Sequence, residues 1–384
     1  MPLPIPTPLR PTMKQPPTRR RALSLVAATL LGAWHMPTTE AAVFGTDDRT
    51  PIAPAHKALA ANVGVVLDDH ERPVCTAFCV GPRTVATAAH CLMPKGERRI
   101  GRLQSFRFAL SGTRGQTARS AFAAPAQLMA GSSMQSLKPP IDSTGDWALV
   151  RLEQPICTAG GLRLSTASAA DVRRSYAARR AINFAFHKDR PNADIVAGAD
   201  CRIGDPVEGA DLRRIDREFA APEHLLLHHC DTAGGASGSP IVAEGAFGPE
   251  VIAINVGTYV QSSVLIEKGE VVERTSSGPL ANTAASAAPI AIALADLDAD
   301  EPVTDRGSLV EMEVLLAAAG APSLASTQAG QRELEAAVAD YQERNGLAVT
   351  GTATRGLLQR LRDDAQSPAS AGLRRRPLET GSVR

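Results

Sequence analysis

The sequence predicts a mainly β protein, either a barrel or a sandwich, followed by a small helical region. Short runs of β-branched and aliphatic residues recur between turn-forming glycine, proline and aspartate residues, which is typical of antiparallel sheets. Near the C-terminus the apolar residues Leu334, Val338 and Tyr341 recur instead at helical spacing. Aromatic residues make up 4% of the chain, so we expect valine, leucine, isoleucine and alanine to fill the core.

Length and charge narrow the possible classes of protein. At 384 residues the chain has room for more than one domain. Its net charge of +1 gives no reason to expect nucleic acid or a charged surface as a partner. The sequence contains no motif for a cofactor and no paired metal-ligand spacing, so we expect neither a cofactor nor a metal.

The N-terminus has the features of an export signal, which we assign to residues 1–42. The basic Arg19–Arg21 precedes the apolar run Ala22–Trp34, which is too short to be a stable membrane anchor. Small residues follow, and cleavage after Ala41 or Ala42 fits them. Translation starts at Met1 or at Met13. We therefore expect a periplasmic or extracellular protein.

Six β-rich runs follow the signal, and each is bounded by residues that favour turns. We predict strands at Ala61–Leu67, Phe78–Ala86, Trp147–Leu152, Ile182–Phe186, His224–His229 and Val251–Gly257. Several short strands at such spacing argue for a barrel or a sandwich rather than for alternating strands and helices.

Three polar residues at the ends or bends of this pattern carry candidate chemistry. His90 closes a β-rich run, Asp146 leads into an apolar strand, and Ser237 lies in the small-residue loop Gly234–Pro240. A serine hydroxyl needs a neighbouring base to become a nucleophile, and a histidine titrates in the right range. An aspartate fixes the tautomer of that histidine and stabilises its protonated form. We predict that Ser237 is the nucleophile, His90 the base and Asp146 the orienting group.

The order His, Asp, Ser with these flanking residues resembles the chymotrypsin-like serine proteases. The segment Val43–Ile52 resembles the mature start of their glutamyl-endopeptidase branch. The resemblance covers residues 43–298 and implies two six-stranded antiparallel β-barrels with the triad in the cleft between them. It also implies an oxyanion hole made by the amides of Gly235 and Ser237. Digestive relatives carry an aspartate immediately before the nucleophile, which Ala236 replaces, so their activation switch is absent.

The chain has six cysteines, and an even number suits a disulfide framework in an exported protein. The family resemblance implies two bonds, Cys75–Cys91 and Cys201–Cys230. The remaining pair, Cys79–Cys157, follows by elimination.

Three residues are candidates for the specificity pocket. Asp231 lies six residues before Ser237, where trypsin-like relatives carry the acid that selects arginine or lysine. The alternative is a turn aspartate that binds nearby backbone. Asn255 occupies the place where glutamyl endopeptidases use a histidine, which argues against a glutamate preference. We also assign Thr232 to the pocket.

The C-terminal region changes in character. We assign 299–307 to a linker, 308–364 to three helices, and 365–384 to a disordered basic tail. Gly346 ends the second helix and Thr354 caps the third. The pattern resembles the small peptidoglycan-binding module of exported bacterial proteins, although the aromatic and Asp-Gly element usual between its first two helices is missing. The alternative is a helical bundle without a ligand.

These observations predict an exported serine endopeptidase that hydrolyses peptide bonds through an acyl-enzyme. Its substrate would be a protein or peptide, and residues 308–364 would associate it with peptidoglycan. The rival hypothesis is a protease-fold binding or adhesion protein whose chemistry is weak or absent. The intact set of His90, Asp146 and Ser237 argues against this rival.

Overall fold

A computed structural model describes most of the chain. The described residues are 42–100, 106–110, 123–134, 136, 139–157, 159–176, 180–191, 194–204, 211–267, 270–321, 330–347 and 349–366. Residues 1–41 of the expected signal peptide and 367–384 of the expected tail lie outside them. Among the described residues no helix combines the length and apolar character that crossing a membrane requires.

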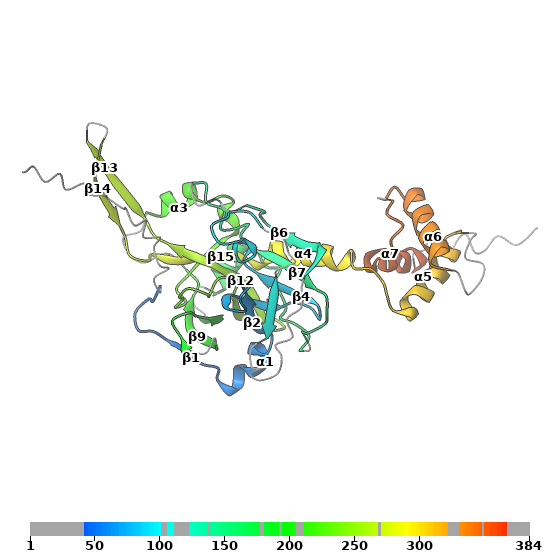
Figure 1. The fold of residues 1–384 in the computed structure, drawn as a ribbon, viewed down its shortest axis with the longest axis horizontal. Helices are drawn as coiled ribbons and strands as arrows, with labels where there is room; N and C mark the ends of the chain where they lie inside the picture. Colours follow the sequence, from blue (N-terminus) through cyan, green and yellow to red (C-terminus); the bar gives the residue numbers. More distant parts are fainter. Residues whose placement is uncertain are drawn as a thin grey trace, which may run out of the picture. The chain divides into compact units, whose positions relative to one another are not determined.

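An antiparallel sheet forms the first part of the fold (Figure 1). Among the described residues it has six strands in the order β5-β2-β3-β4-β7-β6. The strands are β2 (Val63–Leu67), β3 (Pro73–Cys79), β4 (Thr84–Thr87), β5 (Arg107–Leu110), β6 (Ala123–Ala130) and β7 (Ala148–Leu152). The run predicted as one strand at Phe78–Ala86 is in fact two strands, because the Gly81-Pro82-Arg83 segment turns the chain between β3 and β4.

A second antiparallel sheet follows, with seven strands among the described residues in the order β1-β9-β8-β11-β12-β15-β10. Its strands are β1 (Arg49–Pro51), β8 (Arg180–Phe186), β9 (Ile195–Arg202), β10 (Leu225–His228), β11 (Pro240–Gly245), β12 (Gly248–Tyr259) and β15 (Ala281–Ser286). The strands β13 (Ser262–Glu267) and β14 (Glu270–Ser276) pair separately as a two-stranded ribbon (Figure 1). The mainly β chymotrypsin-like class is therefore confirmed. The seventh strand, β1, comes from the N-terminal segment.

The two sheets share one apolar core. Phe78 and Leu149 of the first sheet lie in the same buried cluster as Phe184 and Ile254 of the second. The helix α4 (Ala287–Ala299) adds Ile290 to this cluster. Burial of such side chains contributes roughly 1.5–3 kcal/mol each, so this shared cluster stabilises the packing of the two sheets against each other.

Short helices occupy the connections between the strands. These are α1 (Lys57–Ala60), α2 (Ala169–Tyr176), α3 (Leu212–Glu218) and the 3₁₀ turns Pro54–His56, Ala89–Leu92 and Pro222–His224. Asp211 begins α3 by accepting hydrogen bonds from the amides of Arg213 and Arg214, as expected of an N-cap residue. The turn Ala89–Leu92 matters most here because it carries His90.

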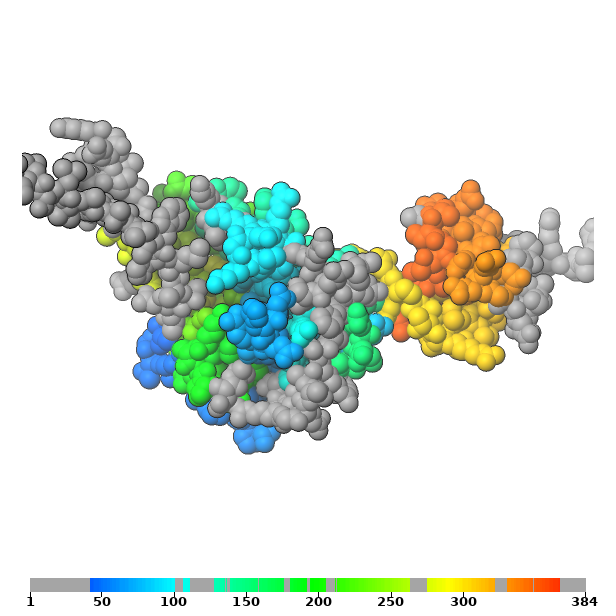
Figure 2. All heavy atoms as spheres, in the orientation of Figure 1, coloured from blue at the N-terminus to red at the C-terminus, as the bar shows by residue number. Residues whose placement is uncertain are grey.

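The C-terminal helices form a small bundle of their own. They are α5 (Arg306–Ala318), α6 (Gln331–Arg344) and α7 (Arg355–Gln366). Leu316, Val338 and Leu361 are buried in one cluster, and Figure 2 shows the atoms of these helices packed together in yellow to red. Thr354 Oγ1 accepts the amide of Leu357 at the start of α7, which is the capping expected from the sequence. The helical domain is confirmed as part of the fold.

Candidate active site

The register between β4 and β7 brings the segments of His90 and Asp146 together. Thr87, the last residue of β4, pairs with Ala148, the first residue of β7. His90 follows β4 by one short turn, and Asp146 comes just before β7. Because the C-terminal end of one antiparallel strand lies beside the N-terminal end of its partner, His90 and Asp146 lie at the same end of these two strands.

Asp146 holds His90 through both of its carboxylate oxygens. Its Oδ1 accepts the backbone amide of His90 at 2.8 Å, and its Oδ2 lies 2.7 Å from Nδ1 of the imidazole. Asp146 is 4% exposed. Burial lowers the pKa of His90, but the charge of Asp146 and its hydrogen bond outweigh burial and leave the pKa above its usual value. This contact places the ring proton on Nδ1 and leaves Nε2 as the basic nitrogen.

Ser237 lies on what we call the serine loop, residues 233–239, between β10 and β11. Two backbone turns shape this loop: the amide of Ala236 donates to Ala233 O and the amide of Ser239 donates to Ala236 O, each at 3.1 Å. Gly238 has a φ of +84°, and a Cβ there would run into Thr76 O and Thr87 Oγ1. Glycine is therefore required at this position by both backbone conformation and space.

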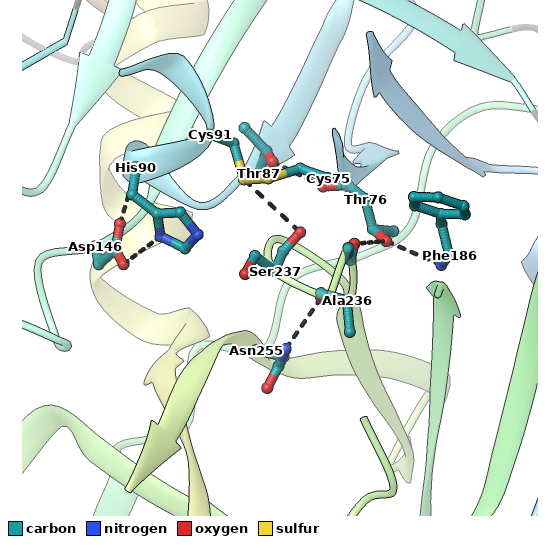
Figure 3. The surroundings of a disulfide bond; sticks show 11 residues. Cys75, Thr76, Thr87, His90, Cys91, Asp146, Phe186, Ala236, Ser237 and Asn255 are labelled. Carbon is teal, nitrogen blue, oxygen red and sulfur yellow. Dashed lines mark hydrogen bonds and ion pairs between the residues drawn. A yellow bond between two sulfur atoms is a disulfide. The ribbon is translucent and has the colours of Figure 1, made fainter. Parts of the chain in front are cut away.

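The disulfide Cys75–Cys91 joins β3 of the first sheet to the turn that carries His90. Cys91 follows His90 directly, and its Sγ lies 3.8 Å from the carbonyl oxygen of Ser237. The amide of Thr76, next to Cys75, donates to the same oxygen at 2.9 Å. Figure 3 shows the result: the imidazole of His90 lies between Asp146 and Ser237, with its second nitrogen toward the side of the serine.

The arrangement has the components of acyl transfer. A carboxylate orients an imidazole, and the imidazole faces a serine hydroxyl. In such a group the imidazole can take the serine proton during attack and return it to the leaving amine. Catalytic hydrogen bonds are often long before substrate binds, so a contact between the imidazole and the hydroxyl in the free protein is not required.

The cysteines pair as the resemblance and the elimination implied. The structure joins Cys75 to Cys91, Cys201 to Cys230 and Cys79 to Cys157. Within the part of the chain that the structure describes, two groups of cysteine and histidine lie close enough together to hold a metal ion, one around His90 and the other around His228. The cysteines in both are disulfide-bonded, so they offer no thiolate for a metal.

Asp231 faces the N-terminal segment of the described chain. Its two carboxylate oxygens accept the amides of Phe44 at 2.8 Å and Asp48 at 3.0 Å. Thr232 exchanges two backbone hydrogen bonds with Ala42. Burial is the main reason that the pKa of Asp231 is raised. This geometry favours the backbone-binding alternative for Asp231 over the pocket acid, although the backbone it binds is distant in sequence.

Both polar atoms of the Asn255 side chain make hydrogen bonds within the protein. Its Nδ2 donates to Ala236 O at 3.0 Å, and its Oδ1 lies 3.0 Å from Nε2 of His228. His228 is completely buried, and burial lowers its pKa to about 3, so the ring is neutral and donates from Nε2. Asn255 therefore links a buried histidine to the peptide immediately before Ser237.

Sequence patterns did not indicate several residues that hold the serine loop. Thr76 and His187 both bind it: Thr76 Oγ1 donates to Gly235 O, and His187 Nδ1 accepts the amide of Ala233 at 3.1 Å. Burial lowers the pKa of His187 to about 4, with the charge of Arg49 as a further cause. No local spacing reveals these contacts, because the partners are between 46 and 159 residues apart.

Comparison with known protein families agrees with this geometry. Residues 75–254 match the model of the trypsin-like peptidase domain. Residues 306–361 match the model of a peptidoglycan binding domain. No curated protein matches the chain. The resemblance to trypsin-like serine proteases, followed by a peptidoglycan-binding domain, is confirmed. The glutamyl-endopeptidase branch stays an expectation.

Proposed function

We propose that the protein is an exported serine endopeptidase that hydrolyses peptide bonds through an acyl-enzyme. Ser237 is the nucleophile, His90 the base and then the acid, and Asp146 the orienting carboxylate. The observation that supports this most is the double contact of Asp146 with the amide and Nδ1 of His90. That contact leaves Nε2 free to serve the serine.

The amides of Gly235 and Ser237 form the oxyanion hole in this proposal. The carbonyl oxygens of the same two peptide units, Gly234 O and Ala236 O, accept hydrogen bonds from Lys188 N and Asn255 Nδ2. A negative oxygen that forms on the substrate would meet N–H groups that are already oriented. Asp231 and Thr232 anchor the N-terminal segment, so we assign the primary specificity to neither.

Labelling with a fluorophosphonate tests the nucleophile. We expect the oxidised protein to be labelled at Ser237 and the Ser237→Ala variant to remain folded but unlabelled and inactive on casein. Loss of the triad serine costs about 10⁶-fold in comparable enzymes. An unlabelled wild-type protein with all three disulfides formed would instead favour the rival, a protease-fold binding or adhesion protein.

The helical domain points to a second partner. We propose that residues 308–364 bind peptidoglycan and that the peptidase acts close to the cell wall, in the periplasm or outside the cell. Three disulfides suit an oxidising compartment, and the signal at 1–42 would direct export. We place the peptidase at 43–298 and the linker at 299–307. The tail was expected at 365–384, but α7 continues to Gln366, and residues 367–384 lie outside the described residues.

Sedimentation with insoluble peptidoglycan tests this assignment. We expect the full chain to be retained and a variant lacking 308–364 to stay in solution. The deletion variant must still be labelled at Ser237, which shows that its peptidase part is folded. Equal retention of both proteins would contradict peptidoglycan binding by this region.

A further inference from the structure

The two amides of the proposed oxyanion hole belong to peptide units whose carbonyl oxygens are hydrogen-bonded to other parts of the protein. A peptide unit is planar and its N–H and C=O groups point in opposite directions. Gly234 O accepts the amide of Lys188 at 2.7 Å, which turns the N–H of Gly235 away from the protein interior. Ala236 O accepts Asn255 Nδ2 at 3.0 Å, which does the same for the N–H of Ser237.

The peptide unit between these two has one hydrogen bond within the loop, from the amide of Ala236 to Ala233 O. It joins Gly235 to Ala236, and Gly235 has a φ of +101°. A preceding glycine, Gly234, adds further freedom, since glycine adopts positive and negative φ almost equally well. A displacement of this unit would move the Cα atoms of Gly235 and Ala236, which it shares with the two donor peptide units, so its carbonyl group needs a contact from outside the loop.

Thr76 supplies that contact. Its hydroxyl donates to Gly235 O at 2.9 Å and accepts the amide of Phe186 at 3.0 Å. The amide of Phe186 can only donate, so the proton of the hydroxyl must point at Gly235. Thr76 is completely buried, and Figure 3 shows its side chain between Phe186 and the serine loop. Buried hydrogen bonds of this kind are costly to lose because water cannot replace them.

The backbone amide and carbonyl oxygen of Thr76 are also hydrogen-bonded. Its amide donates to Ser237 O at 2.9 Å, and its carbonyl oxygen accepts the hydroxyl of Thr87 at 2.7 Å. Thr76 thus joins β3, the end of β8 and the serine loop. Loss of the Thr76 hydroxyl would leave these main-chain hydrogen bonds in place but would remove the hydrogen bond to Gly235 O.

We propose that Thr76 is a positioning residue for the oxyanion hole, because its hydroxyl fixes the Gly235–Ala236 peptide unit and with it the direction of the two donor amides. This inference rests on the proposed function. It assigns to Thr76 no contact with substrate: the hydroxyl acts through the backbone of the serine loop.

Three variants test the proposal in the full chain. Thr76→Val removes the hydroxyl and keeps the shape, Thr76→Ser keeps the hydroxyl, and Thr84→Val makes the same exchange at a buried position of β4. We expect Thr76→Val to lower kcat and the rate of fluorophosphonate labelling about 10- to 100-fold, less than the 100- to 1000-fold loss of a donor itself, with KM unchanged. Thr76→Ser should stay within about threefold of wild type and Thr84→Val within about twofold, in line with the small effects of retained contacts.

Rescue by serine separates positioning from general damage to the fold. Thermal unfolding is measured in parallel, because Thr76→Val also leaves the buried amide of Phe186 without its acceptor. The proposal is overturned if Thr76→Val is labelled as fast as wild type, if Thr76→Ser is as slow as Thr76→Val, or if Thr84→Val is slowed equally.

Amide hydrogen exchange tests the same contact without relying on activity. The amide of Ala236 donates to Ala233 O and belongs to the peptide unit that Thr76 holds. We expect it to exchange at least about tenfold faster in Thr76→Val, as in a local opening, and at the wild-type rate in Thr84→Val. Unchanged exchange overturns the proposal. An unlabelled wild-type protein would refute the proposed function alone and leave this measurement to decide on Thr76.

Discussion

His90 and Asp146 are held by a contact between two side chains, whereas the serine loop is held by its backbone. On the first sheet, one carboxylate binds both the amide and the imidazole of His90. On the second, the carbonyl groups of residues 234–237 are bound by donors from Lys188, Thr76 and Asn255. The first arrangement depends on charge, and the second depends on binding each carbonyl oxygen of a glycine-rich turn.

Substitutions at the His90–Asp146 contact and substitutions around the serine loop should therefore change the activity in different ways. Changes on the acid–base half alter the protonation of His90 and so alter the dependence of the rate on pH. Changes on the serine loop alter the direction of amides that do not titrate, and so lower the rate equally at all pH values. The following variants test this difference, in order of decreasing expected effect.

The largest effect is expected for Asp146→Asn. The amide can neither stabilise the protonated imidazole nor fix the required tautomer, so we expect kcat to fall about 10⁴-fold. Steady-state kinetics at pH 7 to 9 would measure this. The matched exchange Asp68→Asn, in an exposed turn, should leave kcat unchanged. A loss below about tenfold in Asp146→Asn would show that His90 does not depend on this carboxylate.

The disulfides of the first sheet separate stability from activity. Cys79 and Cys157 are 78 residues apart, and Cys75 and Cys91 are 16 apart. In the chain-entropy model the first bond contributes about 4 kcal/mol and the second about 3 kcal/mol to the free energy of unfolding. We expect the double alanine variant of the long loop to lose more stability. The variant of the short loop should lose more activity, because Cys91 lies next to His90 and contacts Ser237.

Denaturant unfolding and kcat, both measured on the two double variants, check this expectation. Equal activity of the two variants would mean that the contact of Cys91 with the serine loop does not matter for catalysis.

Asn255→Ala probes the serine loop. It removes the donor to Ala236 O and leaves the buried Nε2 of His228 without its acceptor. We expect kcat to fall about 100-fold, as for a weakened oxyanion donor, with no change in the shape of the pH profile. Asn62→Ala is the matched control, since Asn62 is equally buried and binds backbone at Ala58 and Gly161. A similar loss of kcat in the control would point to general destabilisation.

The smallest effect concerns pH. His90 must be neutral to act as a base, and Asp146 raises its pKa against the lowering effect of burial. The value of kcat/KM should therefore fall as the pH drops through a midpoint above 6.5. In Asp146→Asn the cause of the increase is gone and burial remains, so the midpoint should move below 6.5. If the midpoint does not move, the fall of kcat/KM at low pH is not caused by protonation of His90.

The sequence was informative where chemistry and local pattern coincide. The strands β2, β7, β8, β10 and β12 lie within or around the runs predicted for them, because alternation and turn residues act over a few positions. The helices α6 and α7 follow the spacing of Leu334 and Val338 and the cap at Thr354. His90, Asp146 and Ser237 could be proposed together from the sequence because the proposed chemistry demands those residue types.

The remaining features depend on contacts across long stretches of chain. The sequence around Thr76 indicates only a strand residue. Its proposed positioning role follows from hydrogen-bond partners that are 110 and 159 residues away. The same holds for Asp231, whose carboxylate meets amides 183 and 187 residues distant. A buried polar group must find a partner, but sequence alone does not say which group that partner is.

The anchoring of residues 42–49 has a practical consequence for recombinant production. A protein that starts at residue 50 would lack Phe44, Asp48 and the guanidinium of Arg49, which binds Asp47 and Asp189. The carboxylate of Asp231, six residues before the serine, would then lie buried without its donors. Such shortened protein should be poorly folded even though it keeps His90, Asp146 and Ser237.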